Sequence, residues 1–327
     1  MGVRFPELLL GIQLFSFLKA ASSIFSFCLR SVWKIGLLLC DVFSRRRSEM
    51  TGRYELDDQS WERISDLISY RQQRGRHRKD DRLMLNGIFW VLCSGAKWRD
   101  LPDRFGAWQT VYHRFRTWRD RSLFTALLKR LHLSLRQDGR IGLNTWMVDS
   151  SSIRATRAAS GAAKKGVTKR WDAATVAWPA SSIWCDTQGI PLSLTVSPGH
   201  HSDSRYFSTV LDKVCLPSSL GRPIKRCRTV LADKGYDSEA LRQYCDRFRI
   251  KPIIPLRQMH CRPKKGLPRL FDRPAYCKRN AIERLFSWLK EHRRLATRFE
   301  KLTSSFEAMI SLACIRICLR KSFSDRT

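Results

Sequence analysis

Residues 276–290 read YCKRNAIERLFSWLK and place one carboxylate, Glu283, among basic side chains. Tyr276, Arg279, Glu283 and Lys290 follow the spacing Y-x2-R-x3-E-x6-K. Since an α-helix turns by about 100° per residue, these four, Ser287 and Arg294 fall in an arc roughly 80° wide. A separate arc carries apolar side chains that suit a core, namely Ile282, Leu285, Phe286 and Leu289. The segment therefore predicts a helix with one buried face and a neighbouring face that offers a lone acid between cations.

The charge of the chain indicates a polyanionic partner. Its 61 Lys+Arg outnumber 29 Asp+Glu, which gives a formal net charge of +32. Such a charge favours phosphate backbones through counterion release and steering. The basic residues are spread along the chain, which indicates a folded body rather than a charged tail. The alternative is a highly charged protein with no role on nucleic acid.

Length and cysteine usage narrow the class of protein. The 327 residues leave room for two domains and a sizeable core. The 11 cysteines include no CxxC pair, and their spacing suggests neither a disulfide framework nor a zinc ribbon. We therefore expect a reducing cytoplasm.

Residues 1–49 differ from the rest of the chain. Their apolar stretches are broken by Lys19, Arg30 and Lys34, so none reaches the ~18 to 20 apolar residues of a spanning helix. The charge order and the missing cleavage site also argue against a signal peptide. We interpret Met50 as the natural start and residues 1–49 as an upstream extension. The alternative is a membrane-associated amphipathic segment.

Residues 50–138 predict a helical DNA-binding domain. Apolar side chains recur at helical spacing over residues 80–92, and Ser94 and Gly95 end that helix. A second, basic helix follows over residues 108–121. A helix, a Gly-containing turn and a basic helix outline a helix-turn-helix reader, although an ordinary helical bundle has the same outline. Three polar side chains of the second helix are candidates for contact with bases: Gln109, His113 and Arg116.

From Gly139 the pattern changes to strands that alternate with helices, which predicts an α/β layer over residues 139–327. The apolar run 144–148 stops at Asp149, and the run 228–232 stops at Asp233. Two acids at strand ends and one on a helix could converge on two divalent cations. Carboxylate oxygens suit Mg²⁺ or Mn²⁺, which could activate an attacking oxygen and stabilise the leaving oxygen of a phosphodiester. An isolated Asp at a strand end is also a common turn former.

These acids and their surroundings resemble the DDE transposases of bacterial insertion sequences, in the insertion sequence five group, which is related to insertion sequence four. Residues 147–155 (MVDSSSIRA) resemble the first acidic motif of that group, and residues 231–237 (LADKGYD) resemble its second. The helix that carries Glu283 matches the Y-R-E-K signature of the group at every spacing. Residues 80–118 resemble its amino-terminal region. The resemblance extends over roughly residues 50–320, with one gap.

The resemblance implies an RNase H-like catalytic domain, a mixed sheet flanked by helices, with Asp149, Asp233 and Glu283 as ligands of two Mg²⁺ or Mn²⁺ ions. It implies cleavage at the terminal inverted repeats of the element and joining of the 3′ ends to target DNA. Arg279 and Lys290 would hold phosphates near the scissile bond, with Tyr276 and Arg294 beside them. The expected partners are double-stranded DNA and further copies of the chain on that DNA, at the bacterial nucleoid, and no membrane partner is expected.

Residues 164–184 depart from the family. Family members have an Arg-Gly-Gly turn there and a strand that ends in Lys-x-His, whereas this chain reads GVTKRWDAATVAWP over residues 166–179. Pro179 is also awkward inside a central strand. We hypothesise a local change of reading frame, with the similarity resuming at Cys185. The alternative function is accordingly a catalytically defective transposase remnant that only binds DNA.

Overall fold

The computed structural model describes residues 52, 54–69, 78–160, 179–198, 201–218, 221–256 and 271–323. All of these except residue 52 belong to one compact unit, Tyr54–Thr327. The extension 1–49 and most of the departing segment 164–184 lie outside the described residues. Within the described ranges, no helix combines the length and apolar character needed to cross a membrane.

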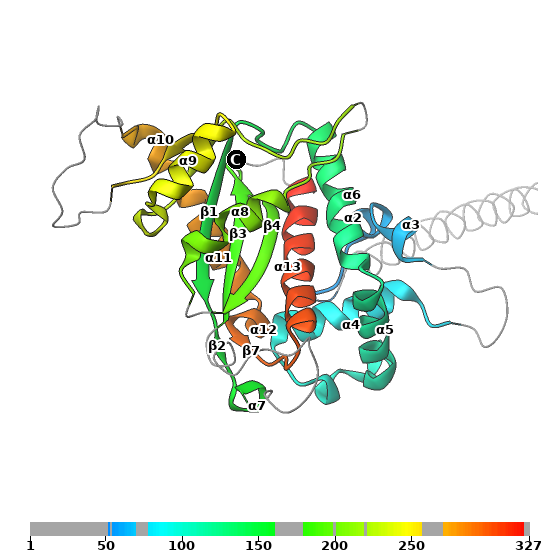
Figure 1. Cartoon of the computed structure of the whole chain (residues 1–327). Helices are drawn as coiled ribbons and strands as arrows, with labels where there is room; N and C mark the ends of the chain where they lie inside the picture. The colour runs from blue at the N-terminus through cyan, green and yellow to red at the C-terminus, as the bar shows by residue number, and fades with distance from the viewer. Residues whose placement is uncertain are drawn as a thin grey trace, which may run out of the picture. The chain divides into compact units, whose positions relative to one another are not determined.

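A mixed five-stranded sheet, in the order β4-β3-β1-β5-β6, forms the centre of this unit (Figure 1). β1 pairs antiparallel with β3, and β3 pairs antiparallel with β4. On its other edge β1 pairs parallel with β5, which pairs parallel with β6. The strands are Thr145–Ser152 (β1), Pro179–Asp186 (β3), Pro191–Pro198 (β4), Thr229–Leu231 (β5) and Lys251–Ile253 (β6). This mixed sheet flanked by helices confirms the predicted RNase H-like fold class.

The β3–β4 turn is held by one buried carboxylate. Asp186 accepts hydrogen bonds from the backbone N–H groups of Gly142, Gln188 and Ile190, at 2.8, 3.0 and 2.8 Å. Gly189 completes the turn at a φ of 75°, which other residues rarely adopt. Pro179 stands at the first residue of β3, where its missing N–H is tolerated. Strand β3 therefore forms beside β1 although Pro179 belongs to the segment that departs from the family.

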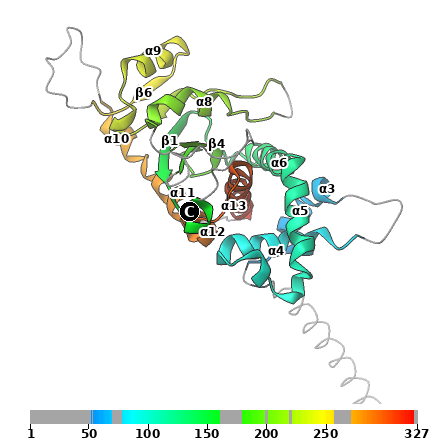
Figure 2. The same ribbon diagram turned by 60° about the horizontal axis from the view of Figure 1, so that its bottom comes forward.

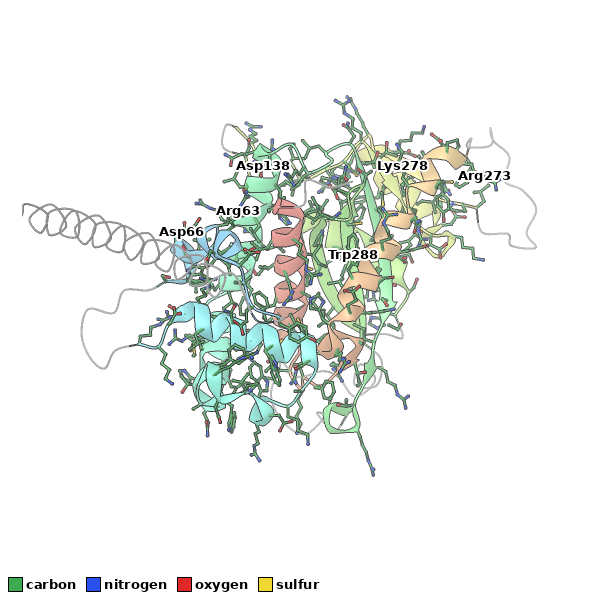
Figure 3. The ribbon with its side chains drawn as sticks, turned by 180° about the vertical axis from the view of Figure 1, so that it is seen from behind. Arg63, Asp66, Asp138, Arg273, Lys278 and Trp288 are labelled. Atoms are coloured by element: carbon green, nitrogen blue, oxygen red, sulfur yellow. The ribbon has the colours of Figure 1, made fainter. Side chains whose placement is uncertain are left out.

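Helices cover both faces of the sheet. On one face α8 (Phe207–Asp212) packs on β3 and β4, with Phe207 and Trp184 at a ring-centroid distance of 5.0 Å. On the other face α11 (Asn280–Glu291) crosses β1 and β3 (Figure 3). The remaining short elements of this part are α7 (Arg157–Ser160), η4 (Asp203–Tyr206), η5 (Lys234–Tyr236), α9 (Glu239–Arg247), α10 (Arg273–Cys277) and α12 (Arg293–Ala296).

The residues before the sheet are helical, as the sequence predicts. The helices are α2 (Asp58–Glu62), α3 (Ser65–Ile68), α4 (Asp81–Ser94), α5 (Trp108–Asp120) and α6 (Leu123–Gln137). Asp80 caps α4 by accepting from two backbone N–H groups, and Gly95 ends it at a φ of 72°. The connection from α4 to α5 holds two 3₁₀ turns, η1 (Trp98–Asp100) and η2 (Asp103–Phe105). It is therefore longer than the three to four residues of a typical helix-turn-helix turn.

The helical part and the sheet part share one core. The long helix α13 (Thr303–Phe323) packs against α6 and also against β4 (Figures 1 and 2). A parallel pair of short strands, β2 (Arg154–Ala155) and β7 (Thr297–Arg298), links the chain just after β1 to the segment before α13. The apolar side chains of α4, α5, α6, the sheet and α13 form a continuous buried cluster. The strand that carries Asp149 is thus followed by a segment that pairs with the residues just before α13.

Candidate active site

Asp149 and Asp233 lie in matching positions on neighbouring parallel strands. The last register pair of β1 and β5 is Met147 with Leu231. Each aspartate lies two residues beyond that pair, and the backbone at Asp233 is still extended. Because side chains two residues apart on a strand point to the same face, both carboxylates project from the same side of the sheet. The parallel register therefore brings together two acids that are 84 positions apart in the sequence (233 − 149).

Glu283 reaches this face from α11. The apolar residues of that helix recur at helical spacing and are buried against the sheet, namely Ala281, Ile282, Leu285, Phe286 and Leu289. Glu283 lies in the first turn of the helix on the adjacent, exposed face. The first turn favours a carboxylate because of the positive end of the helix dipole. The predicted buried face beside an exposed Glu283 is therefore confirmed, but the predicted helix is broken at residues 278 and 279, so Tyr276 lies on the separate helix α10.

Arg279 joins the first and third acids. Its Nη2 donates to Asp149 Oδ2 at 2.5 Å, and its Nη1 donates to Glu283 Oε1 at 2.8 Å. The side chain of Arg279 is 14% exposed, against 21% for Asp149 and 59% for Glu283. Arg279 was expected at a DNA phosphate, and this bridge was not predicted from the sequence. The i,i+4 spacing of Arg279 and Glu283 was the available signal for the ion pair between these two residues, which is one half of the bridge.

Tyr276 lies within electrostatic reach of all three acids. Burial raises the pKa of its phenol, the Arg279 guanidinium opposes that rise, and the carboxylates of Asp233, Asp149 and Glu283 add to it. Tyr276 is on α10, one short turn before α11, and its ring lies 5.1 Å from that of Phe271. All three acids therefore act electrostatically on this one phenol.

The donor chemistry of this region fits a hard divalent cation. Asp149 and Glu283 both direct a carboxylate oxygen at one positive group, and carboxylate oxygens are the ligands that Mg²⁺ and Mn²⁺ prefer. In the described part of the chain, however, no three side chains of His, Cys, Asp or Glu are grouped closely enough to hold a metal ion. Arg279 lies between two of the three candidate ligands.

The two other basic residues of the predicted face, Lys290 and Arg294, lie in different surroundings. Lys290 is exposed on α11, two turns beyond Glu283, beside Ser151 of β1. Arg294 lies outside the site, because α11 ends at His292, whose backbone is extended. The Arg294 guanidinium is buried, donates to Glu300 Oε1 at 2.6 Å and to the Ala96 carbonyl at 2.6 Å, and lies over the ring of Trp98. Arg294 therefore joins α12 to the end of α4, and the prediction that it shares one arc with Glu283 is wrong.

The three candidate base readers lie together on α5. Gln109, His113 and Arg116 are exposed, whereas Val111 and Phe115 are buried between them. Their spacing of four and three residues puts them on one helical face. This face belongs to the helical part and is formed independently of the acidic site.

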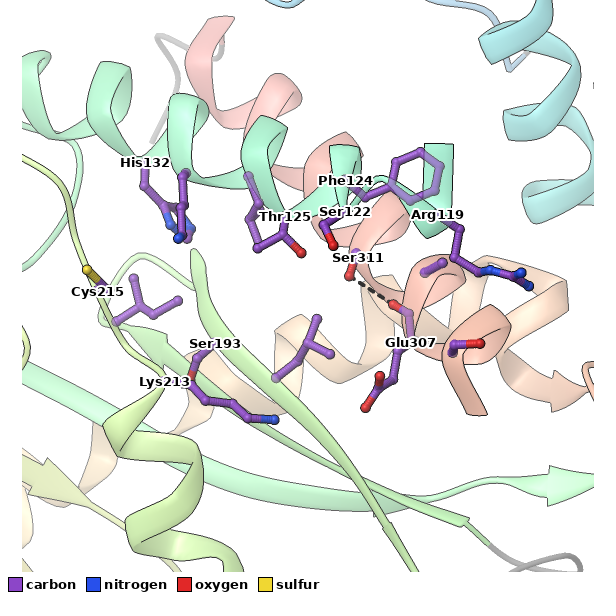
Figure 4. Close-up of a pocket in the computed structure, with 16 residues that line it drawn as sticks. Arg119, Ser122, Phe124, Thr125, His132, Ser193, Lys213, Cys215, Glu307 and Ser311 are labelled. Carbon is purple, nitrogen blue, oxygen red and sulfur yellow. Dashed lines mark hydrogen bonds between the residues drawn. The ribbon is translucent and has the colours of Figure 1, made fainter. Parts of the chain in front are cut away.

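A separate cavity of about 490 Å³ lies between α6, α13 and β4 (Figure 4). Lys213 and Glu307 extend into it from opposite sides, and Lys213 donates to Thr195 Oγ1 at 2.7 Å. Burial raises the pKa of Glu307, and the charge of Lys213 opposes that rise. The described lining includes neither Asp149 nor Glu283, so the cavity is distinct from the acidic site.

Two acids at or just beyond the ends of neighbouring parallel strands, a third acid on a helix and an RNase H-like sheet are the arrangement expected of a polynucleotidyl-transfer enzyme. The chain matches the family "Transposase DDE domain" over residues 144–318, which is more than half of its length. Residues 56–128 match a second family, "Putative transposase of IS4/5 family". The chain belongs to the DDE transposase family of insertion sequences, whose members are nucleotidyl-transfer enzymes and generally use divalent metal ions.

Individual relatives agree with this assignment. A transposase of insertion sequence element IS6501 from Brucella ovis is 31% identical over 135 residues, which cover 41% of this chain and 93% of the relative. A transposase of insertion sequence element IS402 from Burkholderia cepacia is 31% identical over 137 residues, covering 42% of this chain and 60% of the relative. Among solved structures, a piggyBac transposase synaptic complex with hairpin DNA has a TM-score of 0.42 and 10% identity, covering 80% of this chain and 71% of that one.

Proposed function

We propose that the chain cuts DNA at the terminal inverted repeats of its insertion sequence and joins the 3′ ends to target DNA. Asp149, Asp233 and Glu283 are the catalytic acids of this proposal. The observation that carries it is the arrangement of two acids at matching register on parallel strands, with a third acid joined to the first through Arg279.

The three carboxylates would hold two Mg²⁺ or Mn²⁺ ions. When bound, such ions would lower the pKa of the attacking oxygen and stabilise the leaving oxygen of the phosphodiester. The described residues would orient the three carboxylates relative to one another. The parallel pairing of β1 and β5 fixes the two aspartates relative to one another, and the buried face of α11 fixes Glu283 over β1.

Basic side chains around the acids would hold the DNA backbone. Lys278 and Arg284 are exposed on either side of Glu283 in the sequence, and Lys290 is exposed two turns further along α11. Such contacts position a duplex without reading its sequence. We assign base contacts to Gln109, His113 and Arg116, since they share one exposed face of α5 and an α-helix fits the major groove.

A nicking assay on duplex DNA that carries the ends of the element, with Mg²⁺, tests the proposal. Asp149→Asn, Asp233→Asn and Glu283→Gln should each lower cleavage by about a thousandfold or more while duplex affinity changes little. Asp66→Asn is the matched control, because Asp66 is an exposed acid of the helical part. Cleavage by the Glu283→Gln protein at the unchanged rate would remove the central assignment. Duplex binding without cleavage by the unaltered chain would identify the remnant instead.

The base-reading face requires its own test. Arg116→Ala should weaken binding to the element's ends several-fold more than binding to an arbitrary duplex, because a base contact discriminates and a phosphate contact does not. Arg121→Ala, at the exposed end of α5, is the control for charge. Equal losses on both duplexes would assign Arg116 to the backbone instead.

A further inference from the structure

The Arg279 guanidinium divides its two terminal nitrogens between carboxylates of different elements. Asp149 belongs to β1 and Glu283 to α11, and each accepts from a different nitrogen. A guanidinium usually presents two parallel N–H groups to one carboxylate. Arg279 instead spans two acids, so its guanidinium lies between the two carboxylates.

This arrangement solves an electrostatic problem. Two carboxylates that face the same small region repel one another unless a positive charge lies between them. Arg279 supplies one such charge and holds the α11 acid near the β1 acid. The same two carboxylates are among those that the proposed function assigns to divalent cations. An arriving ion and the guanidinium therefore require the same acceptors.

The contact is open to exchange. Glu283 is well exposed, and exposed ion pairs contribute little to stability, whereas the Asp149 half of the bridge is more buried. The third polar nitrogen of Arg279, Nε, is buried and makes no hydrogen bond within the described part of the chain. The bridged position thus leaves one donor unsatisfied, which lowers the cost of leaving it.

Exposed cations indicate where the guanidinium would go. Lys278 precedes Arg279 and Arg284 follows Glu283, and both are exposed on the side of the site that we assign to DNA. A guanidinium fork matches the oxygens of a phosphate as well as those of a carboxylate. The bridge to the acids and the phosphate contact expected from the sequence are therefore two alternative positions of the same side chain.

We propose that Arg279 is an exchangeable internal counter-ion, which competes with divalent cations for Asp149 and Glu283 and transfers to a DNA phosphate when they bind. This inference rests on the proposed function, because it assumes that these two acids hold the ions. Its consequence is positive coupling between ion and DNA binding, since each favours the released position of Arg279.

Mn²⁺ titration of the full chain, followed by electron paramagnetic resonance of the free ion, tests the competition without any need for catalysis. Arg279→Gln should bind Mn²⁺ about tenfold more tightly than the unaltered chain, because the competitor is gone. Arg284→Gln removes the same charge from an exposed position of the same helix and should change the affinity by about twofold or less. An Arg279→Gln affinity no higher than that of Arg284→Gln would overturn the inference.

Two further variants keep the outcomes distinct. Asp149→Asn should lose Mn²⁺ binding. If Asp149→Asn loses Mn²⁺ binding but Arg279→Gln binds Mn²⁺ no more tightly than Arg284→Gln, the ion site stands and only the inference fails. If the unaltered chain and Arg279→Gln both fail to bind Mn²⁺, the ion site of the proposed function fails as well. Should Arg279→Gln not fold, as judged by thermal unfolding, Arg279→Lys replaces it. A single ammonium cannot span both acids, so its Mn²⁺ affinity should exceed that of the unaltered chain, and an equal or lower affinity would contradict the competition.

The coupling is measured by duplex affinity with Ca²⁺ and with EDTA. Ca²⁺ should raise the affinity of the unaltered chain several-fold more than that of Arg279→Gln, because only the unaltered chain gains a released guanidinium. Equal ratios for the two proteins would contradict the transfer of Arg279 to phosphate.

Discussion

Two arginine–glutamate contacts lie on either side of α11, and they differ in what surrounds them. The open contact joins Arg279 to Glu283 and Asp149, and its Glu283 side chain is 59% exposed. The closed contact joins Arg294 to Glu300 with both side chains below 8% exposure. The closed guanidinium also donates to the Ala96 carbonyl and lies over two aromatic rings. The same pair of residue types is therefore exchangeable in one place and structural in the other, and burial decides which.

The two contacts also lie in different parts of the fold. The closed contact lies where α12 meets the end of α4, so it holds the helical part against the sheet part. The open contact lies at the beginning of α11, above the parallel strands that carry the aspartates. We infer that the closed contact keeps the helical part in place while the open one is free to exchange partners. Altering the open contact should therefore affect mainly activity, whereas altering the closed contact should affect mainly stability.

Glu283→Gln should have the largest effect on activity and a small effect on stability. We expect cleavage of element-end DNA to fall by about a thousandfold or more, since a proposed ion ligand is lost. The free energy of unfolding should change by about 1 kcal/mol or less, because the altered ion pair is exposed. Cleavage rates and urea unfolding of the same preparation measure both. A loss of more than about 3 kcal/mol would show that the open contact is structural too.

Glu300→Gln should have the opposite profile. It leaves the buried Arg294 guanidinium without its carboxylate, which costs about 3 kcal/mol of folding stability. Below the unfolding temperature the remaining folded protein should still cleave DNA, because Glu300 lies outside the acidic site. Urea unfolding, followed by cleavage normalised to the folded fraction, measures the two effects. Stability equal to that of the unaltered chain would remove the distinction between the contacts.

The sequence predicts the elements around the open contact better than those around the closed one, although it predicts neither contact itself, and the reason is physical. Glu283, its apolar partners and the two strand-end aspartates are visible as local periods of the chain, 3.6 residues for the helix and 2 for the strands. The structure adds the parallel register of β1 with β5, which the local periods do not fix. The fold class was accordingly predictable from the pattern of strands and helices, whereas the prediction that the three acids share one site rests on the resemblance that they carry.

The closed contact depends on information that no local period contains. The helical arc of α11 would continue to Arg294, but His292 adopts an extended backbone and ends the helix. The partner carbonyl of Arg294 belongs to Ala96, 198 residues away. Long-range packing of this kind overrides the local pattern, which is why Arg294 was assigned to the wrong face. The Arg279 bridge was missed for the same reason, since Asp149 is 130 residues away.

His292, between the two contacts, should make stability depend on pH. Burial lowers the pKa of its imidazole to about 4, and the nearby charges of Arg316 and Arg320 act in the same direction. The pKa of His292 is lower in the folded chain than the value of 6.5 in the unfolded chain, so the unfolded chain binds the proton first as the pH falls. The contribution of His292 to folding stability is therefore complete above pH 6.5 and is lost as the pH falls towards 4. At pH 5 the loss from this histidine is about 2 kcal/mol.

The comparison with His292→Asn isolates that contribution. His132, whose pKa burial also lowers to about 4, adds a loss of the same sign, whereas Asp186, raised to about 6, gains stability as the pH falls. Between pH 7 and pH 5 the unaltered chain should therefore lose about 2 kcal/mol more than His292→Asn. Urea unfolding at the two pH values measures the difference. Parallel pH profiles would show that His292 is accessible to protons in the folded state.

Gly95→Ala should have the smallest effect, and it tests how closely the closed contact is packed. Gly95 ends α4 at a φ of 72°, and an added Cβ would lie 2.8 Å from the Cβ of Arg293, next to Arg294. Gly139→Ala is the matched control, since Gly139 has a φ of 69° but no atom within 4 Å of an added Cβ. Both variants bear the left-handed backbone cost of about 1 kcal/mol. Only Gly95→Ala must also move α12, which should add about 1 kcal/mol because packed interiors yield little. Equal unfolding free energies for the two variants would mean that α12 shifts freely, and the helical part would then be held less firmly by the closed contact than its burial indicates.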